Sequence, residues 1–141
     1  MQRFLWLVLL IVFTIFIFFS SSLPATESAK MSGYVVTVLN AAFEMLGMRY
    51  DGNLEYTIRK LAHFMEFGGQ AWLLCKTYNE FYVSNRMSTG YILFFGLLTA
   101  VVDEYIQFFT PGRECRVTDV LLDFSGTFCM WVAYRIWQWT K

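Results

Sequence analysis

The sequence has no run of like charges and no basic tail, which argues against a nucleic-acid-binding protein. No low-complexity tract or internal repeat of fixed period is visible, so we expect a single domain over residues 1–141. Only three cysteines are present, and they suggest no disulfide framework. Cys75 and Cys129 lie in apolar runs and only Cys115 lies in a polar turn, so we interpret them as small hydrophobic side chains.

Apolar residues are abundant by contrast. The chain is 57% hydrophobic and 20% aromatic, with a mean hydropathy of +0.45 and zero formal charge. Soluble domains contain about 45–50% apolar residues, and here the excess lies in long blocks rather than in an alternating or narrow helical pattern. The sequence therefore predicts an all-α polytopic membrane protein, a bundle of four transmembrane helices.

Four apolar runs are expected to span the bilayer, over residues 4–23, 58–76, 89–109 and 117–137. The first run would be about 30 Å long as a helix, which is enough to cross. A cleaved signal peptide with Ala25 at the cleavage site is the alternative for this run, although the run is long for one. Turn residues separate the later runs, notably Pro111 and Gly112.

Residues 31–48, between the first two runs, are apolar but interrupted by polar residues such as Thr37, Asn40 and Glu44. This pattern predicts an amphipathic helix on the membrane surface or at the rim of the bundle. A fifth span is the alternative interpretation.

Four spans place both termini on one side of the membrane. The basic residues divide almost evenly between the two faces, so their count does not decide the orientation. Because the first helix usually dominates, and Arg3 precedes it, we expect both termini in the cytoplasm. The expected location is the bacterial cytoplasmic (inner) membrane.

Polar residues recur inside the apolar runs at helical spacing. In the second run they form one stripe at i, i+4, i+7 and i+11: Arg59, His63, Glu66 and Gln70. The third run ends with Asp103 and Gln107 four residues apart, and the fourth begins with the stripe Asp119, Asp123 and Gly126, where the glycine permits close approach of a neighbouring helix.

The start of the second run, the end of the third and the start of the fourth share one face of an alternating bundle. Ionisable residues in membrane spans face the bundle interior or a wet cavity and usually mark function. The sequence thus predicts one polar pocket that opens on one membrane face, which is the outer face in the expected orientation.

Three segments carry a resemblance to a known family: "RKLAHFMEFG" from Arg59, "DEYIQFFTPGR" from Asp103, and "TDVLLDFSG" from Thr118. In this order and spacing they resemble the VanZ-like family of small bacterial membrane proteins. Phe67 stands where the family commonly has tyrosine, and Glu114-Cys115-Arg116 replaces a smaller, more neutral linker. The resemblance implies low-level resistance to the glycopeptide teicoplanin without modification of the peptidoglycan precursor terminus, and it does not identify the biochemical activity.

The candidate catalytic residues are His63, Glu66, Asp103 and Asp123. His63 is the only histidine, and an imidazole can transfer protons near neutral pH. A structural hydrogen bond or a bond to a metal are the alternatives for this side chain. The candidate anion- or substrate-binding residues are Arg59, Lys60, Glu104, Gln107, Arg113 and Asp119.

The pocket combines four basic with five acidic side chains, counting Arg116 among the basic ones. One histidine with carboxylates suits Mg²⁺, Mn²⁺ or Ca²⁺ better than Zn²⁺. No tight metal-spacing motif is present, however, so no metal-ligand set is assigned and a divalent cation such as Mg²⁺ is an open question. Ion pairs that neutralise one another are the purely structural alternative.

Three functions fit these residues. The first is an enzyme acting on a lipid-linked phosphate or a related envelope lipid, because arginine forks suit phosphate recognition and the apolar helices can accommodate a polyprenyl-phosphate-type tail. The second is a non-catalytic binder or carrier of a lipid or of the glycopeptide target. The third is a subunit of a proton- or ion-coupled transporter, for which the chain is short.

Overall fold

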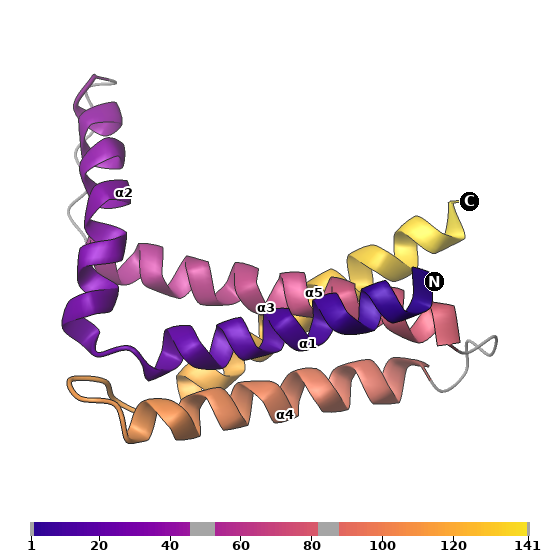
Figure 1. The fold of residues 1–141 in the computed structure, drawn as a ribbon. Coiled ribbons are helices and arrows are strands. Elements are labelled where there is room, and N and C mark those ends of the chain that lie inside the picture. The colour runs from indigo at the N-terminus through magenta and orange to yellow at the C-terminus, as the bar shows by residue number, and fades with distance from the viewer. Residues whose placement is uncertain (1, 46–52, 82–87, 141) are drawn as a thin grey trace.

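The computed structural model describes residues 2–45, 53–81 and 88–140, and in these ranges every regular element is an α-helix. The helices are α1 (Gln2–Ser22), α2 (Ala25–Met45), α3 (Leu54–Phe81), α4 (Ser88–Phe108) and α5 (Val117–Trp139) (Figure 1). The all-α prediction is confirmed. By length and composition, α1 and residues 89–108 of α4 could cross a membrane.

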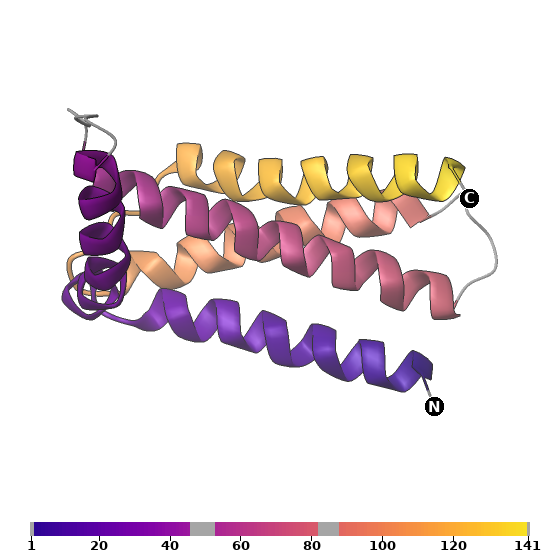
Figure 2. The same ribbon diagram turned by 90° about the horizontal axis from the view of Figure 1, so that it is seen from above.

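Four of the helices form a bundle and the fifth lies across one end of it. α1, α3, α4 and α5 run side by side with alternating direction, and α2 extends across the end where α1 finishes (Figures 1 and 2). Both chain termini lie at the opposite end. As a result, the end of α1, the start of α3, the end of α4 and the start of α5 share one end of the bundle (Figure 1). The sequence predicted this for α3, α4 and α5.

Two helices begin earlier than predicted. α2 begins at Ala25 rather than near residue 31, because the Pro24 carbonyl accepts hydrogen bonds from the N–H groups of Glu27 and Ser28. Residues 46–48 of the predicted surface helix lie outside the described residues. α3 begins at Leu54, since the side chain of Asn53 caps the helix by accepting the Tyr56 N–H at 3.0 Å.

The bundle buries several polar and charged side chains and exposes many large apolar ones, which is the reverse of the usual pattern in a soluble protein. Its buried side chains include Gln70, Asp103, Glu104 and Asp123, whereas large apolar side chains face outward on all four bundle helices. Examples of these exposed residues are Leu5, Val12 and Phe19 on α1, Leu61 and Met65 on α3, Phe94 and Val101 on α4, and Leu121 and Phe128 on α5. A surface of this kind suits an apolar surrounding.

The closest helix approach positions the polar residues. Gly126 of α5 lies against the backbone of α3, so near that a β-carbon there would overlap the Phe64 carbonyl oxygen. This confirms the close approach predicted for Gly126. Because His63 precedes Phe64 and Asp123 lies one turn before Gly126, the same approach brings these two side chains together.

Candidate functional site

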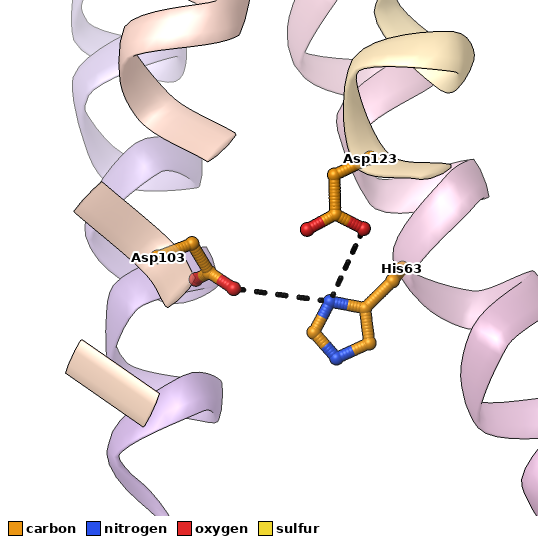
Figure 3. Close-up of side chains that lie close together, drawn as sticks. All are labelled: His63, Asp103 and Asp123. Carbon is orange, nitrogen blue, oxygen red and sulfur yellow. Dashed lines mark ion pairs between the residues drawn. The ribbon is translucent and has the colours of Figure 1, made fainter. Parts of the chain in front are cut away.

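Three side chains from three helices converge at the end of the bundle nearest α2. The Nδ1 atom of His63, on α3, lies 3.9 Å from Oδ2 of Asp103 on α4 and 3.7 Å from Oδ1 of Asp123 on α5 (Figure 3). One ligand atom from each of the three lies within 4.8 Å of the others. We call this group the His-Asp-Asp cluster; its donor set of one imidazole and two carboxylates could hold a metal ion.

The two carboxylates of the cluster are deeply buried, and several polar atoms of the cluster are unpaired among the described residues. Asp103 is 0% exposed and Asp123 is 1% exposed. Asp103 accepts a hydrogen bond from Nε2 of Gln107 at 2.8 Å, which fixes one of its carboxylate oxygens. Nδ1 of His63, Oδ1 of Asp103 and Oδ2 of Asp123 are buried without a hydrogen-bond partner among the described residues. Buried polar atoms are normally satisfied, so three such atoms in one place require an explanation.

A polar cavity of about 270 Å³ opens beside the cluster and is rich in basic side chains. His63 forms part of its wall, together with Tyr56, Arg59, Lys60, Gln107, Gly112, Arg113, Glu114, Arg116 and Asp119. We call it the polar cavity. Several of these groups have partners within the chain: Nζ of Lys60 pairs with Asp119 at 2.5 Å, and Arg116 pairs with Glu114.

Arg113 holds the end of α1. Residues 110–113 form a type II turn, with Pro111 at the second position and Gly112 at the third with φ +75°. The Arg113 N–H closes the turn by donating to the Thr110 carbonyl. From this turn Nε of Arg113 donates to the Leu23 carbonyl at 3.0 Å and Nη2 donates to the Ser20 carbonyl at 3.1 Å. Burial lowers the pKa of Arg113, while the Asp103 carboxylate opposes that shift. A guanidinium stays charged in proteins.

A second cavity of about 280 Å³ is mainly apolar and adjoins the first. Its wall combines apolar side chains of α1, α2 and α3 with a few polar ones at one side: Phe16, Phe19, Leu23, Val35, Ile58 and Ala62, with Ser20, Ser28, Arg59, His63, Glu66 and Arg113. We call it the apolar groove. Arg59, His63 and Arg113 border both cavities, so the two spaces meet at these residues.

The structure brings most of the predicted site residues together. Of the four candidate catalytic residues, His63, Asp103 and Asp123 form the cluster, whereas Glu66 lies in the wall of the apolar groove. Five of the six candidate binding residues line the polar cavity: Arg59, Lys60, Gln107, Arg113 and Asp119. The sixth, Glu104, is 2% exposed and accepts the Arg116 backbone N–H at 3.0 Å.

Among the basic candidates, Arg59 is the one best placed to meet a ligand. Lys60 is paired with Asp119, and Arg113 donates to backbone carbonyls. Arg59 borders both cavities, and within the described parts of the chain it has no ion-pair or hydrogen-bond partner. The sequence predicted these basic residues at one level of the bundle. It could not predict which of them is available to a ligand, because their partners come from other helices and from backbone atoms.

The sequence analysis missed the contribution of α1. Phe16, Phe19 and Ser20 of α1, and Leu23 directly after it, border the apolar groove, and nothing in their local pattern distinguishes them from the rest of the first run. It also missed the partners of Gln70, whose amide donates to the hydroxyls of Thr14 at 2.9 Å and Thr99 at 3.2 Å, joining α1, α3 and α4.

A family model described as VanZ/LLP1 matches residues 5–138, which is nearly the full chain. The chain therefore belongs to the VanZ-like family, as the three sequence segments indicated. No significant match was found among proteins of curated function or among solved structures.

Proposed function

We propose that this VanZ-family chain is a four-pass protein of the bacterial cytoplasmic membrane, in which α1, α3, α4 and α5 cross and α2 lies at the membrane surface. The outward apolar side chains on all four bundle helices support this arrangement. The shortest of these helices has 21 residues, which corresponds to about 30 Å. α2 extends across the bundle end, where an interfacial helix would lie (Figure 1).

In the proposed orientation the termini are cytoplasmic and the polar cavity faces outward. Cys115 provides the test because it is exposed in the loop beside that cavity, whereas Cys75 is buried. A membrane-impermeant maleimide should label Cys115 on intact cells, and Cys115→Ser should remove the label. Labelling of Cys115 that requires cell lysis would reverse the orientation.

The proposed substrate is an amphiphile with an anionic head group, specifically a lipid-linked phosphate. The observation that carries this proposal is the junction of the two cavities at Arg59, His63 and Arg113. A phosphate in the polar cavity would meet Arg59, and its polyprenyl or acyl tail would lie in the apolar groove against Phe16 and Phe19. Planar guanidinium groups bind phosphate through paired hydrogen bonds.

The proposed reaction is hydrolysis of the phosphate ester or anhydride. Water would attack phosphorus, its proton would pass to Asp123 or His63, and the bond from phosphorus to the leaving oxygen would break. The same group would then return the proton to the leaving oxygen, so that an alcohol or a phosphate is released. Asp103, fixed by Gln107, would orient His63. Positioned proton transfer contributes about 10²- to 10⁴-fold to rates of this kind.

The direct test measures turnover in purified protein. Wild type in nanodiscs is incubated with a polyprenyl diphosphate, a polyprenyl monophosphate and phosphatidylglycerol in the presence of Mg²⁺, and products are identified by mass spectrometry. We expect one of these lipids to be cleaved, and we expect the rate to fall about 100-fold or more in His63→Ala and Asp123→Asn.

The matched control is Lys76→Gln, which changes a cation at the other end of the bundle and should retain full activity. Absence of product from wild type with all three lipids would refute the catalytic proposal. Equal rates in wild type and both cluster variants would refute the assignment of the reactive residues.

The second candidate function is non-catalytic binding or transport of the same lipid. The internal pairing of Lys60 with Asp119 and of Arg113 with α1 favours it, because paired groups can serve structure alone. Under this function, lipid would bind to wild type and to both cluster variants with no product formed. Family membership supports an association with glycopeptide resistance, and either action on an envelope lipid would leave the precursor terminus unmodified.

A further inference from the structure

The His-Asp-Asp cluster places two buried carboxylates beside one imidazole, and Arg113 offsets the charge of Asp103 only from outside the cluster. Asp103 and Asp123 both point toward Nδ1 of His63 (Figure 3). Among the described residues, no lysine or arginine forms an ion pair with either carboxylate. Burying a carboxylate without a compensating charge is unfavourable, because the ion loses its hydration. Some cationic species is needed to make this arrangement favourable.

The hydrogen-bonding pattern points to a cation larger than a proton. The His63 Nδ1 distances of 3.7 and 3.9 Å are too long for hydrogen bonds to the two carboxylates. Nδ1 is itself buried without a partner, as is Oδ2 of Asp123, a residue that is 1% exposed. Among the described residues, neither atom is satisfied by a hydrogen bond from a neighbouring side chain.

The distances suit one ion between the three side chains. Ligand atoms that lie about 2.1 Å from the same small divalent cation are at most about 4.2 Å apart. Both His63 distances fall below that limit, and the three ligand atoms all lie within 4.8 Å of one another. Small side-chain rotations, moving the atoms by about 0.6 Å or less, would bring all three into a first coordination shell.

We propose that His63, Asp103 and Asp123 form a binding site for one divalent cation, with Nδ1 of His63 and one oxygen of each carboxylate as ligands. The neutral imidazole would carry its proton on Nε2, which leaves the Nδ1 lone pair for the ion. In the ion-bound state, Asp123 rather than His63 would therefore accept a proton from water. Gln107 acts as the outer partner that orients Asp103 through the 2.8 Å hydrogen bond.

The donor set selects among metals. Two carboxylates with one imidazole suit Mn²⁺ and Mg²⁺, and imidazole also accepts Zn²⁺. With only three protein ligands, an ion here would keep open positions, and His63 borders both cavities. The inference goes beyond the proposed function and does not depend on it, since a cation can bind whether or not a lipid is cleaved.

The test is Mn²⁺ binding to the full chain in nanodiscs after treatment with EDTA and dialysis. The electron paramagnetic resonance signal of free Mn²⁺ should fall with a stoichiometry of one ion per chain, and Mg²⁺ should compete. His63→Ala and Asp123→Asn should weaken binding at least about tenfold, since each removes a direct ligand. Glu80→Gln, which alters an exposed acid at the other end of α3, should bind as wild type does.

A second measurement, on wild type alone, tests whether the bound ion contacts His63 even if a cluster variant fails to fold. Electron spin echo modulation of the bound Mn²⁺ should contain the coupling of an imidazole nitrogen. Failure of wild type to bind Mn²⁺ would overturn the inference, as would bound Mn²⁺ without nitrogen coupling. If wild type binds no Mn²⁺ and still cleaves lipid in EDTA, the metal-site proposal alone is wrong. If wild type binds Mn²⁺ and cleaves no lipid, only the catalytic proposal is wrong.

Discussion

The charged side chains at the two ends of the bundle have different surroundings. At the end near the termini, Nζ of Lys76 lies over three tryptophan rings, at 5.8 Å from Trp6, 5.6 Å from Trp72 and 5.1 Å from Trp137. At the other end, carboxylates, guanidinium groups and the imidazole lie between helices. We call these the aromatic end and the polar end.

We interpret this difference as one between membrane anchoring and the proposed site. Tryptophan and lysine side chains are typical of a membrane–water interface, where the rings and the cation need no further partner. At the polar end, charged groups occupy buried positions that apolar side chains could fill at a lower cost in folding free energy. Charges that are expensive to bury and incompletely paired are the ones expected to bind or react.

The largest expected effect comes from breaking the helix approach that builds the polar end. In Gly126→Ala the added methyl group would meet the Phe64 carbonyl oxygen, which is backbone and cannot rotate away. Overpacking of this kind costs about 3 kcal/mol, and we expect a large drop in thermal stability in detergent. Gly68→Ala is the matched control, because its nearest neighbour would lie at an ordinary 3.6 Å. Equal melting temperatures for the two variants would contradict this packing.

The next effect concerns the guanidinium that holds α1 at the polar end. Arg113→Gln removes two charge-assisted hydrogen bonds, to the carbonyls of Leu23 and Ser20. Hydrogen bonds from charged groups contribute about 1.5–3 kcal/mol each. Because the glutamine amide can retain one of the two, we expect a loss of about 2 kcal/mol, measured by thermal unfolding. Arg135→Gln, in the second half of α5 and far along the chain from this turn, serves as the control. A larger loss in the control would show that Arg113 does not secure α1.

A smaller effect is expected at the aromatic end. Lys76→Gln removes a cation that lies near three rings, and such contacts are worth about 0.5–1 kcal/mol at exposed sites. Thermal unfolding should therefore show a small decrease, with lipid turnover and Mn²⁺ binding unchanged. Loss of either activity in this variant would remove the distinction between the two ends.

The smallest effect is expected from the exposed ion pair in the loop. Glu114→Gln breaks the contact with Arg116, and both side chains are more than half exposed. Exposed pairs usually contribute little to stability. We expect no measurable change in melting temperature. A clear change would mean that this loop takes part in holding the polar cavity.

The sequence contained enough information to predict the common level of the polar groups. The i, i+4, i+7 stripe from Arg59 and the pair Asp119 and Asp123 identify one face of each helix, and alternating chain direction brings those faces to one end. The start of α2 at Ala25 could not be predicted in this way, because residues 25–30 have no apolar periodicity.

Pairing between side chains was beyond sequence reasoning. Arg113 and Arg59 are equivalent by composition and depth, yet one donates to α1 carbonyls and the other borders both cavities. Glu66 shares a helical stripe with His63 but faces the apolar groove rather than the cluster. These distinctions depend on interhelical distances of a few ångströms, which spacing along one helix does not determine.

The most direct test of the polar end compares one cation from each end in lipid binding. Native mass spectrometry of wild type should detect a bound polyprenyl monophosphate, with a neutral polyprenol binding more weakly. Arg59→Gln should weaken phosphate-lipid binding about tenfold, as expected for loss of one charge-assisted contact, whereas Lys76→Gln should leave it unchanged. Equal affinity in both variants, or equal binding of the neutral lipid, would contradict an anion-binding site at the polar end.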